Sequence, residues 1–273
     1  MKKLVFFILI LGLFSTLTTY EEVLTPFLTG SQLADAPPQV QGLTGEHPTI
    51  MMYNTQTLGR AKVSNRTELD ILVGLIENQD FSILQEVRDV TNTTRQTLRQ
   101  ELHKEYEIHE SERRGRTAYK ESMFFIWNTS VFSVSEPRFY FEDSTDIYER
   151  EPYVINVTHG ETWFYLVSIH VQPRNAEEEI EALLQTLSTY TDPYVLLGDL
   201  NADCSYYDPS QKPTIETVTW ILPTGADTTV SDRTCAYDRI ITNNNSLFNG
   251  YAVYDKGQQI SDHYPIATQV TVS

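Results

Sequence analysis

The sequence predicts an α/β fold in which sheets and helices pack in layers. Apolar runs of strand length alternate along the chain with segments whose apolar residues recur at helical spacing. Polar, chemically versatile residues follow many of these apolar runs at the point where a strand would end. About 250 residues follow the N-terminal segment, a length that suits one domain.

The N-terminal 20 residues have the pattern of a secretory signal peptide. Lys2 and Lys3 supply the positive end, and residues 4–14 form an apolar core too short to span a bilayer. Small and hydroxyl residues follow at 15–19, so cleavage is expected near Thr19 or Tyr20. Residues 21–47 contain several Pro and Gly without apolar periodicity, which indicates an extended arm or a removable pro-segment. A single catalytic domain is predicted for 48–273, and no later segment is apolar enough to span a membrane.

Strands are predicted from apolar runs rich in β-branched and aromatic residues. The first is expected at 49–53, directly after Pro48, and a second short one at 81–84 ends at Gln85 and Glu86. The remaining strands are expected at 122–127, 153–157, 163–169, 194–198, 238–242 and 264–270.

Helices are predicted between these strands. An apolar stripe at i, i+3, i+4 and i+7 runs from Leu69 to Ile76, with Asn65 or Thr67 near the helix start. A second helical pattern covers 94–105. A third helix is expected after Asn175 as its cap, because three consecutive Glu residues at 177–179 favour the positive end of a helix dipole.

Charge and cysteine content narrow the function classes. The formal net charge of −17 argues against a general nucleic-acid binder, although a local basic surface is enough for a nuclease. Basic residues do cluster in sequence between Arg113 and Lys120. The only two cysteines, Cys204 and Cys235, have one intramolecular pairing, and a disulfide is expected in an oxidising compartment. Five Asn-x-Ser/Thr sequons fit passage through a glycosylating route; they begin at Asn65, Asn92, Asn128, Asn156 and Asn244.

The residues at the predicted strand ends form the candidate site. Mg²⁺ prefers oxygen ligands and keeps several waters, so one or two carboxylates are enough to hold it. Glu86 is the strongest single metal candidate, flanked by Asn54 and Asp262. The whole strand-end set is Asn54, Glu86, His170, Asp199, Asn201, Asp238, Asp262 and His263.

Two histidines in this set point to acid–base chemistry on a phosphate. An imidazole titrates near neutral pH, so His170 and His263 could share the tasks of activating water and protonating the leaving oxygen. A histidine used in this way usually has its other ring nitrogen held by a carboxylate. Glu121 and Asp238 are the candidates for that position.

Seven segments in order resemble a secreted deoxyribonuclease I, within the endonuclease/exonuclease/phosphatase superfamily. Gly-Asp-Leu-Asn at 198–201 and Ser-Asp-His at 261–263 are shared across the superfamily. Gln-Glu-Val-Arg-Asp at 85–89, Tyr-Lys-Glu at 119–121 and Cys-Ala-Tyr-Asp-Arg-Ile at 235–240 narrow the likeness to the deoxyribonuclease I branch. Segments 53–57 and 150–152 complete the series, and the likeness runs from about residue 48 to the C-terminus.

The resemblance implies a four-layer sandwich of two packed mixed β-sheets flanked by helices. It implies His170 and His263 as the acid–base pair, oriented by Glu121 and Asp238 respectively. The residues that would bind metal (Mg²⁺ or Mn²⁺) and the scissile phosphate are Asn54, Glu86, Asp199, Asn201 and Asp262. The residues that match family positions contacting double-stranded DNA are Arg88, Tyr119, Arg150, Tyr206 and Tyr237.

Two departures from the family pattern concern calcium. The loop before Arg150 has no cysteine, whereas the family often has a small disulfide there. Asp227, Thr229 and Ser231 match a family calcium loop, but Arg233 replaces its last hydroxyl residue. Asp227 and Thr229 are therefore a candidate Ca²⁺ site whose occupancy stays open. The stretch between Tyr251 and Ser261 is also short.

The main hypothesis is a secreted, metal-dependent endonuclease that cleaves double-stranded DNA with little sequence preference and leaves 5′-phosphate ends. Its compartment would be extracellular, or the vacuolar or lysosomal lumen. A phospholipid or inositol-phosphate phosphodiesterase with the same machinery is the alternative. A non-catalytic homologue that binds actin or a receptor is disfavoured because the whole catalytic set is retained. Actin binding as a side property is not decided by these residues, and the family implies a monomer.

Overall fold

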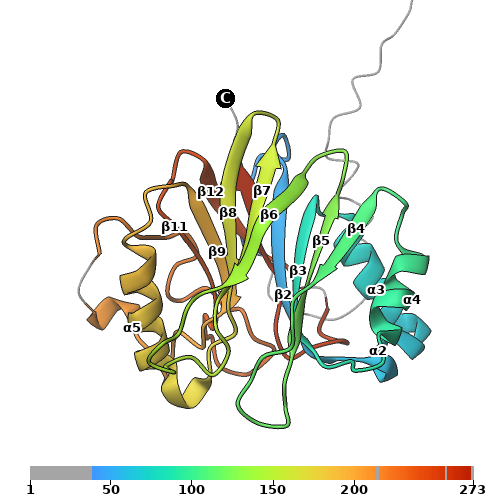
Figure 1. The fold of residues 1–273 in the computed structure, drawn as a ribbon, viewed down its shortest axis with the longest axis horizontal. Helices are drawn as coiled ribbons and strands as arrows, with labels where there is room; N and C mark the ends of the chain where they lie inside the picture. The colour runs from blue at the N-terminus through green and yellow to red at the C-terminus, as the bar shows by residue number, and fades with distance from the viewer. Residues whose placement is uncertain (1–38, 213–214, 256, 272–273) are drawn as a thin grey trace, which may run out of the picture. The chain divides into compact units, whose positions relative to one another are not determined.

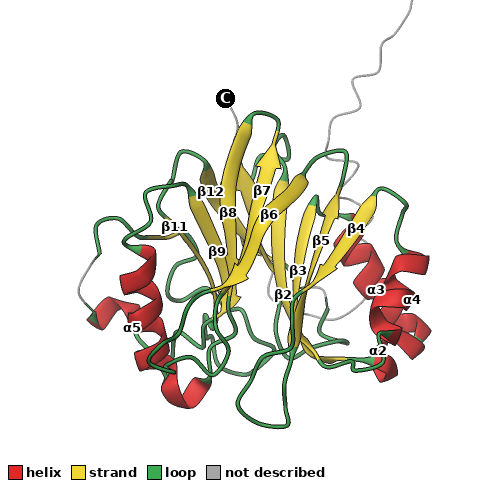
Figure 2. Cartoon of the chain, in the orientation of Figure 1, coloured by secondary structure: helices red, strands yellow, loops and turns green. Residues whose placement is uncertain are grey.

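The computed structural model describes residues 39–212, 215–255 and 257–271. The chain divides into two units, and the first, Met1–Asp35, lies wholly outside these ranges. The predicted signal peptide (1–20) and most of the predicted arm (21–47) therefore fall outside the described residues. Within the second unit, two β-sheets face each other and helices lie on the two outer sides (Figures 1 and 2).

The first sheet has seven strands in the order β1-β12-β13-β2-β3-β5-β4. Only β2 and β3 pair in parallel; the other neighbours are antiparallel, so the sheet is mixed. The strands are β1 (Gln39–Gln41), β2 (Thr49–Leu58), β3 (Phe81–Val87), β4 (Tyr106–Glu110), β5 (Ser122–Asn128), β12 (Phe248–Val253) and β13 (Ile266–Val270).

The second sheet has six strands in the order β10-β11-β9-β8-β7-β6. It is also mixed, because β8 and β9 are parallel and the other neighbours are antiparallel. The strands are β6 (Ser133–Tyr140), β7 (Tyr153–His159), β8 (Thr162–Ser168), β9 (Tyr194–Asp199), β10 (Thr219–Trp220) and β11 (Asp238–Thr242).

Helices cover the outer faces of both sheets, as Figure 2 shows. The seven-stranded sheet is covered by α2 (Arg60–Ser64), α3 (Arg66–Glu77) and α4 (Thr93–Glu101). The six-stranded sheet is covered by α5 (Ala176–Leu187), which follows the 3-10 turn η1 (Pro173–Asn175); a second such turn, η2, spans Pro209–Gln211. None of the helices in the described ranges has the length and apolar character needed to cross a bilayer.

Three apolar clusters hold the four layers together. Because strand side chains alternate between faces, Phe81 and Ile83 of β3 enter the cluster between the two sheets, whereas Leu84 enters the cluster under the helices. That second cluster contains the predicted stripe of α3, Leu69, Leu72 and Ile76. The third cluster packs Ile180, Leu183, Leu184 and Leu187 of α5 against the six-stranded sheet. The predicted four-layer sandwich is confirmed.

One predicted helix boundary is wrong, and one predicted capping hydrogen bond is absent. The pattern over 94–105 gives a helix that ends at Glu101, because Leu102 is extended and the chain turns into β4. The Tyr106 hydroxyl donates to the carbonyl oxygens of Glu77 and Gln79, so tertiary contacts end the helix. Asn175 does not cap α5, since its side chain instead donates to Gln172 within the preceding 3-10 turn. Asn65, by contrast, accepts from the Thr67 N–H at 3.1 Å and caps α3.

The two parallel strand pairs bring four carboxyl ends to one end of the sandwich. A residue with a Cβ cannot replace Gly198 on β9 without movement, because that Cβ would lie 2.3 Å from the carbonyl oxygen of Ile169. The close approach is what allows Asp199 to pair with His170 as an isolated parallel bridge beyond the end of β8.

We predict that Gly198→Ala lowers the free energy of unfolding by about 1–3 kcal/mol, the usual cost of overpacking. Gly74→Ala is the control, because a Cβ at that position of α3 meets nothing within 4 Å and should stabilise the helix by about 0.5–1 kcal/mol. Urea unfolding of both variants measures the two effects. A Gly198→Ala protein as stable as the wild type would contradict the packing described.

A second prediction concerns Glu179, a fully buried residue of α5. Burial raises its pKa to about 7, against the opposing effects of the backbone N–H groups of Glu149 and Gln172 and of the charge of Arg150. The folded protein therefore holds a proton that the unfolded chain, with a glutamate pKa of about 4.3, has already released. The contribution of this proton to the free energy of unfolding is fully present at acid pH and is lost as the pH rises to about 7.

The variant Glu179→Gln carries no charge and should not lose stability in this way. Relative to the wild type, we expect it to gain on the order of 2–3 kcal/mol in free energy of unfolding between pH 5 and pH 8. Urea unfolding at the two pH values tests this, with Glu178→Gln as the exposed control on the same helix. An equal gain at both pH values would argue against a titrating carboxyl.

Candidate active site

The candidate site residues lie at the carboxyl ends of the parallel strands and on the loops next to them. Asn54 lies on β2, Glu86 on β3 and Asp199 at the end of β9, and Asp238 begins β11 beside Asp199. These ends point to the lower, loop-rich part of the view in Figure 1. The structure therefore brings residues from both sheets to one place, as expected for ligand sites in α/β proteins.

His170 is paired with Glu121 from the start of β5. Nδ1 of His170 lies 2.5 Å from Oε1 of Glu121, and both residues are buried. Burial would raise the pKa of Glu121, but the charges of His170, Arg150 and Arg88 hold it at about 2. Because that carboxylate stays ionised and accepts from Nδ1, Nε2 of His170 is the nitrogen that is left for chemistry.

His263 is paired in the same way with Asp238. Nδ1 of His263 lies 2.8 Å from Oδ2 of Asp238, which is fully buried. Burial would lower the pKa of His263, but the charges of Asp238 and Asp199 raise it above its ordinary value. Each of the two predicted histidines therefore forms a buried imidazole–carboxylate pair.

Asp199 lies between the two histidines. Its Oδ2 is 3.6 Å from Nε2 of His170 and 3.6 Å from Nε2 of His263. The same oxygen accepts a hydrogen bond of 2.9 Å from Nδ2 of Asn54, which belongs to the opposite sheet. Both Nε2 atoms thus face one small polar space, which is the arrangement that a group held between an acid and a base requires.

Glu86 and Asn54 supply the oxygen-rich side of this space. Nδ2 of Asn54 also donates to Oε1 of Glu86 at 3.3 Å, and Thr57 donates its backbone N–H to Oε2 of Glu86 at 3.0 Å. Glu86 has a left-handed backbone (φ 58), which a residue other than glycine adopts only when its surroundings enforce it. A half-buried carboxylate beside a buried amide offers the oxygen ligands that a hard divalent cation prefers.

A second group of potential metal ligands comprises Asp199, Asp238 and His263, whose ligand atoms lie within 4.8 Å of one another. In this group Oδ2 of Asp238 is already engaged by Nδ1 of His263. The other oxygen of Asp238, Oδ1, has no hydrogen-bond partner among the described residues, so this group is a second place at which a cation could bind. Asp262 lies at the rim, with a largely exposed side chain whose Oδ1 is 4.0 Å from Nε2 of His263.

Asn201 completes the β9 end. Its backbone is left-handed (φ 48), its N–H donates to Oδ1 of Asp199 at 3.0 Å, and its Nδ2 donates to the carbonyl oxygen of Val171. The residue is buried. These bonds fix the orientation of the Asp199 carboxylate as well as that of the Asn201 amide.

Four of the residues predicted to contact DNA form two pairs, one beside Glu121 and one that includes the residue before Asp238. Arg88 lies 3.4 Å from Glu121 and packs over the ring of Tyr119, which is 72% exposed. In the other pair, the rings of Tyr206 and Tyr237 are 5.6 Å apart.

Arg150 differs from the other residues predicted to contact DNA because it is buried. Its Nε donates to the carbonyl oxygen of His170 at 3.0 Å and lies 3.0 Å from Oε1 of Glu121. Its guanidinium therefore supports the His170–Glu121 pair in this structure.

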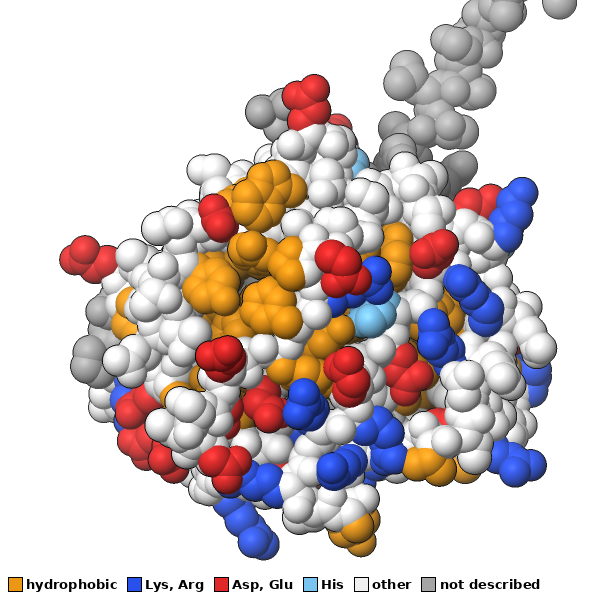
Figure 3. All heavy atoms as spheres, viewed as in Figure 1, with side chains coloured by type: hydrophobic (Ala, Val, Ile, Leu, Met, Phe, Trp, Pro, Cys, Tyr) orange, Lys and Arg blue, Asp and Glu red, His pale blue; other side chains and the backbone are white. Residues whose placement is uncertain are grey.

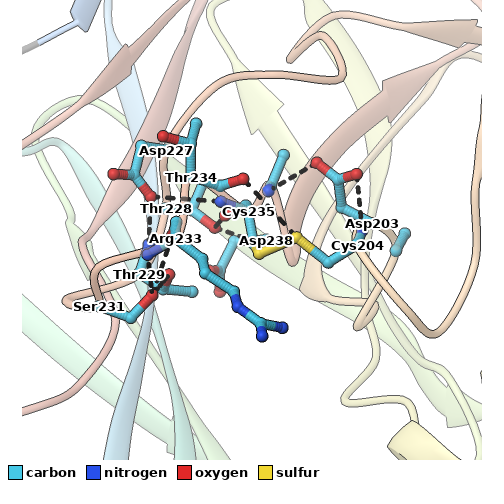
Figure 4. Close-up of a disulfide and its surroundings, with 12 residues drawn as sticks. Asp203, Cys204, Asp227, Thr228, Thr229, Ser231, Arg233, Thr234, Cys235 and Asp238 are labelled. Atoms are coloured by element: carbon cyan, nitrogen blue, oxygen red, sulfur yellow. Dashed lines mark hydrogen bonds between the residues drawn. A yellow bond between two sulfur atoms is a disulfide. The ribbon is translucent and has the colours of Figure 1, made fainter.

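A disulfide joins the loop after β9 to the segment just before β11, the strand that begins at Asp238 (Figure 4). Cys204 and Cys235 are bonded, and Asp203 accepts from the backbone N–H groups of Cys204 and Ala236 beside the bond. The Thr228 hydroxyl accepts from the N–H of Asp238 at 3.1 Å. The 227–235 segment thus connects the covalent link to the His263–Asp238 pair.

The candidate calcium residues Asp227 and Thr229 lie in this segment (Figure 4). The Thr229 hydroxyl is 3.2 Å from that of Ser231, and Ser231 bonds to the backbone of Arg233. The hydroxyl groups of the segment therefore bond mainly to one another and to the backbone.

Lys62 links two segments of the site, and no pattern in the sequence predicts this role. Its ammonium donates to the carbonyl oxygens of Thr55 and Gln56 and to that of Ile260, just before the Ser-Asp-His segment. Burial lowers its pKa. A lysine on a short helix usually faces solvent, so only the folded structure identifies it as a link between β2 and the His263 loop.

The surface near the site is less acidic than the composition implies. Figure 3 shows Lys and Arg side chains gathered over the lower part of this face, where the strand-end loops lie in Figure 1. Acidic side chains are interspersed among them and continue over the left side of the view. The net charge of −17 is therefore spread unevenly.

Comparison with known proteins identifies the family and the fold. Residues 51–263 match the model of the Endonuclease/Exonuclease/phosphatase family. That range includes all of the strand-end residues described above. Among solved structures, the catalytic domain of human Nocturnin superposes with a TM-score of 0.63 at 14% identity, covering 86% of this chain and 98% of that one. A humanized D. rerio TDP2 gives a TM-score of 0.60 at 16% identity over 82% and 99%.

Curated relatives are more similar in sequence. Deoxyribonuclease-1 of Gallus gallus and that of Homo sapiens are each 32% identical over 254 residues, which cover 80% of this chain and 90% of theirs. Deoxyribonuclease-1 of Bos taurus is 30% identical over 259 residues, covering 81% and 92%. The chain belongs to the endonuclease/exonuclease/phosphatase family and, within it, to the deoxyribonuclease I family.

Proposed function

We propose that this protein is a divalent-metal-dependent endonuclease that hydrolyses double-stranded DNA with little sequence preference. The observation that carries the proposal is the placement of Nε2 of His170 and Nε2 of His263 at equal distances, 3.6 Å, from one oxygen of Asp199. Each imidazole is held by its own carboxylate, so both can exchange protons with a phosphate lying between them.

The chemistry follows from these positions. A water oxygen attacks phosphorus while the bond from phosphorus to the 3′ oxygen breaks. Nε2 of one histidine takes the proton of the water, and Nε2 of the other gives a proton to the leaving oxygen. The products are a 5′-phosphate and a 3′-hydroxyl.

Metal would bind at Glu86 and Asn54, with Asp262 and Asp199 at the edge of that set. When bound, Mg²⁺ or Mn²⁺ supplies positive charge that stabilises the phosphate as negative charge builds up on it. The Asn201 amide and the ordered strand ends hold the surrounding groups in place. Asp227 and Thr229 are proposed as a separate, structural Ca²⁺ site.

The exposed rings and arginine near the two imidazole–carboxylate pairs support DNA as the substrate. Arg88 with Tyr119, and Tyr206 with Tyr237, would contact sugar–phosphate backbone and groove walls on both sides of the cleaved bond. Such contacts respond to groove width rather than to base identity, which accounts for weak sequence preference. The site is assembled within one chain, so activity as a monomer is proposed.

The disulfide supports a location in an oxidising compartment. Disulfides persist outside the cell and in the secretory pathway, and are rare in the cytosol. We therefore propose secretion, or delivery to a vacuolar or lysosomal lumen. Plasma, gut or vacuolar DNA would all be chemically equivalent substrates.

We predict that the disulfide-intact protein converts supercoiled plasmid to open circles with Mg²⁺ and does so no longer in EDTA. His170→Ala and His263→Ala should each lower the nicking rate by about 10²–10⁴-fold, because each removes a proton-transfer group. His103→Ala is the matched control, since His103 also pairs with a glutamate, Glu105, but on the exposed surface. The control should nick at the wild-type rate.

The same preparations are offered sphingomyelin and an inositol phosphate. Cleavage of these substrates without plasmid nicking would replace the endonuclease proposal by the phosphodiesterase alternative. Nicking that persists in His170→Ala would instead contradict the roles given to the histidines.

A further inference from the structure

Gln85 precedes the candidate metal ligand Glu86 and faces the opposite sheet. The residue is fully buried. On β3, Phe81 and Ile83 belong to the apolar cluster between the sheets, so alternation places the side chain of Gln85 on the same face. The strand is irregular at this point, since the register with β5 shifts between Leu84 and Val87 and Glu86 is left-handed. Such irregularities re-aim side chains near active sites.

The amide of Gln85 bonds to both parallel strands of the other sheet. Its Nε2 donates to the carbonyl oxygen of Ile169 at 2.8 Å and to Oγ of Ser168 at 2.9 Å. Its Oε1 accepts from the backbone N–H of Asp199 at 3.1 Å. Ser168 in turn donates to the carbonyl oxygen of Leu197 at 2.8 Å. One side chain of the seven-stranded sheet thus fixes the end of β9 and the residue before His170.

Polar groups in an apolar interior are unfavourable unless they form hydrogen bonds. Ile83, on the same strand face as Gln85, and Leu197, on β9, belong to the apolar cluster between the sheets. An amide placed there without partners would be strongly unfavourable, and its full set of partners exists only when the two sheets meet in one register. An apolar residue would fill the space but would leave the Asp199 N–H and the Ile169 carbonyl without this partner.

We propose that Gln85 is a positioning residue for catalysis, which sets the register between the two sheets at the active site. It acts through Asp199 and His170 and touches neither phosphate nor metal. By fixing Asp199 relative to Glu86 on its own strand, it holds the two histidines and the metal ligands at their working separation. The proposal deepens the endonuclease function proposed above and rests on it for its kinetic readout.

Gln85→Met is the direct test, because it keeps the length of the side chain and removes all three hydrogen bonds. Exchange of the Asp199 amide hydrogen, followed by NMR, should accelerate by about tenfold or more, since that amide loses its acceptor. With Mg²⁺ and plasmid DNA, kcat should fall by about 10–100-fold, the range typical when a residue supporting a metal or catalytic group is replaced. KM for DNA should stay near that of the wild type, because the hydrogen bonds of Gln85 go to Ser168, Ile169 and Asp199 and to none of the groups proposed to contact DNA.

Gln269→Met is the matched control. Gln269 is also a buried glutamine with bonds from both ends of its amide, to Gly42, Asn249 and Thr44. It pairs with Thr49 at the opposite end of β2 from Asn54. Its replacement should lower stability but leave kcat and the exchange of the Asp199 amide as in the wild type.

Gln85→Glu is the second variant, for the case in which Gln85→Met does not fold. It keeps an acceptor for the Asp199 N–H at the same length and alters the donor that bonds to Ile169. We expect nearly wild-type exchange at Asp199 with an intermediate kcat. Unchanged exchange at Asp199 in Gln85→Met, fast exchange in Gln85→Glu, or an equal loss of kcat in Gln269→Met would overturn the proposal. A wild type that does not nick DNA would overturn the function alone, because amide exchange still reports on the bridge.

Discussion

The active site depends on the contact between the carboxyl ends of two parallel strand pairs from different sheets. The hydrogen bond from Asn54 to Asp199, 2.9 Å long, joins β2 to β9 directly at that contact. Each sheet alone carries only part of the chemistry. The seven-stranded sheet supplies Asn54, Glu86 and Glu121, whereas the six-stranded sheet supplies Asp199, Asp238 and the strand that leads to His170. The site therefore forms only when the two sheets pack against each other.

Polar groups at this contact are costly unless they are satisfied, and the structure satisfies most of them with one another. Glu121 is paired with His170 and Arg150, and His263 with Asp238. Removing one member of such a pair leaves a buried charge without its partner, which usually costs more than the pair contributes. Left-handed backbone at Gln56, Thr57, Glu86 and Asn201 adds strain at the same strand ends. The large apolar clusters between the layers are what stabilise this polar, strained end.

The sequence predicted those parts of the fold that depend on local pattern. The run before Asp199 is continuously apolar, and the stripe of α3 recurs at helical spacing. The predicted strand and helix are both present. Five strands were missed because their residues are poor strand formers or lie at a sheet edge; they are β1, β4, β6, β10 and β12. β6 contains Pro137, β12 contains Gly250, and β4 pairs with only one neighbour. Their conformation comes from pairing across the sheet, which a local pattern does not record.

The site residues also divide into those that a local sequence pattern predicts and those that depend on distant parts of the chain. Asp199, His170 and His263 could be predicted because chemically distinctive residues follow apolar runs. Lys62 and Gln85 could not, because their importance comes from carbonyl and amide groups contributed by distant parts of the chain. Arg150 matches a family position that contacts DNA, but that match does not predict its buried contacts with Glu121 and His170. Only the folded structure shows those contacts.

The most direct test of the two-histidine site uses DNA in which the leaving 3′ oxygen at one bond is replaced by sulfur. A thiolate leaves without help from an acid, because thiols ionise near pH 8.5 whereas alcohols hardly ionise in water. Cleavage of this bond should be restored toward the wild-type rate in only one of the two variants, His170→Ala or His263→Ala, and that histidine is the acid. The other variant should remain slow, since water still needs its base. Recovery of both variants, or of neither, would contradict a division of acid and base roles between the two histidines.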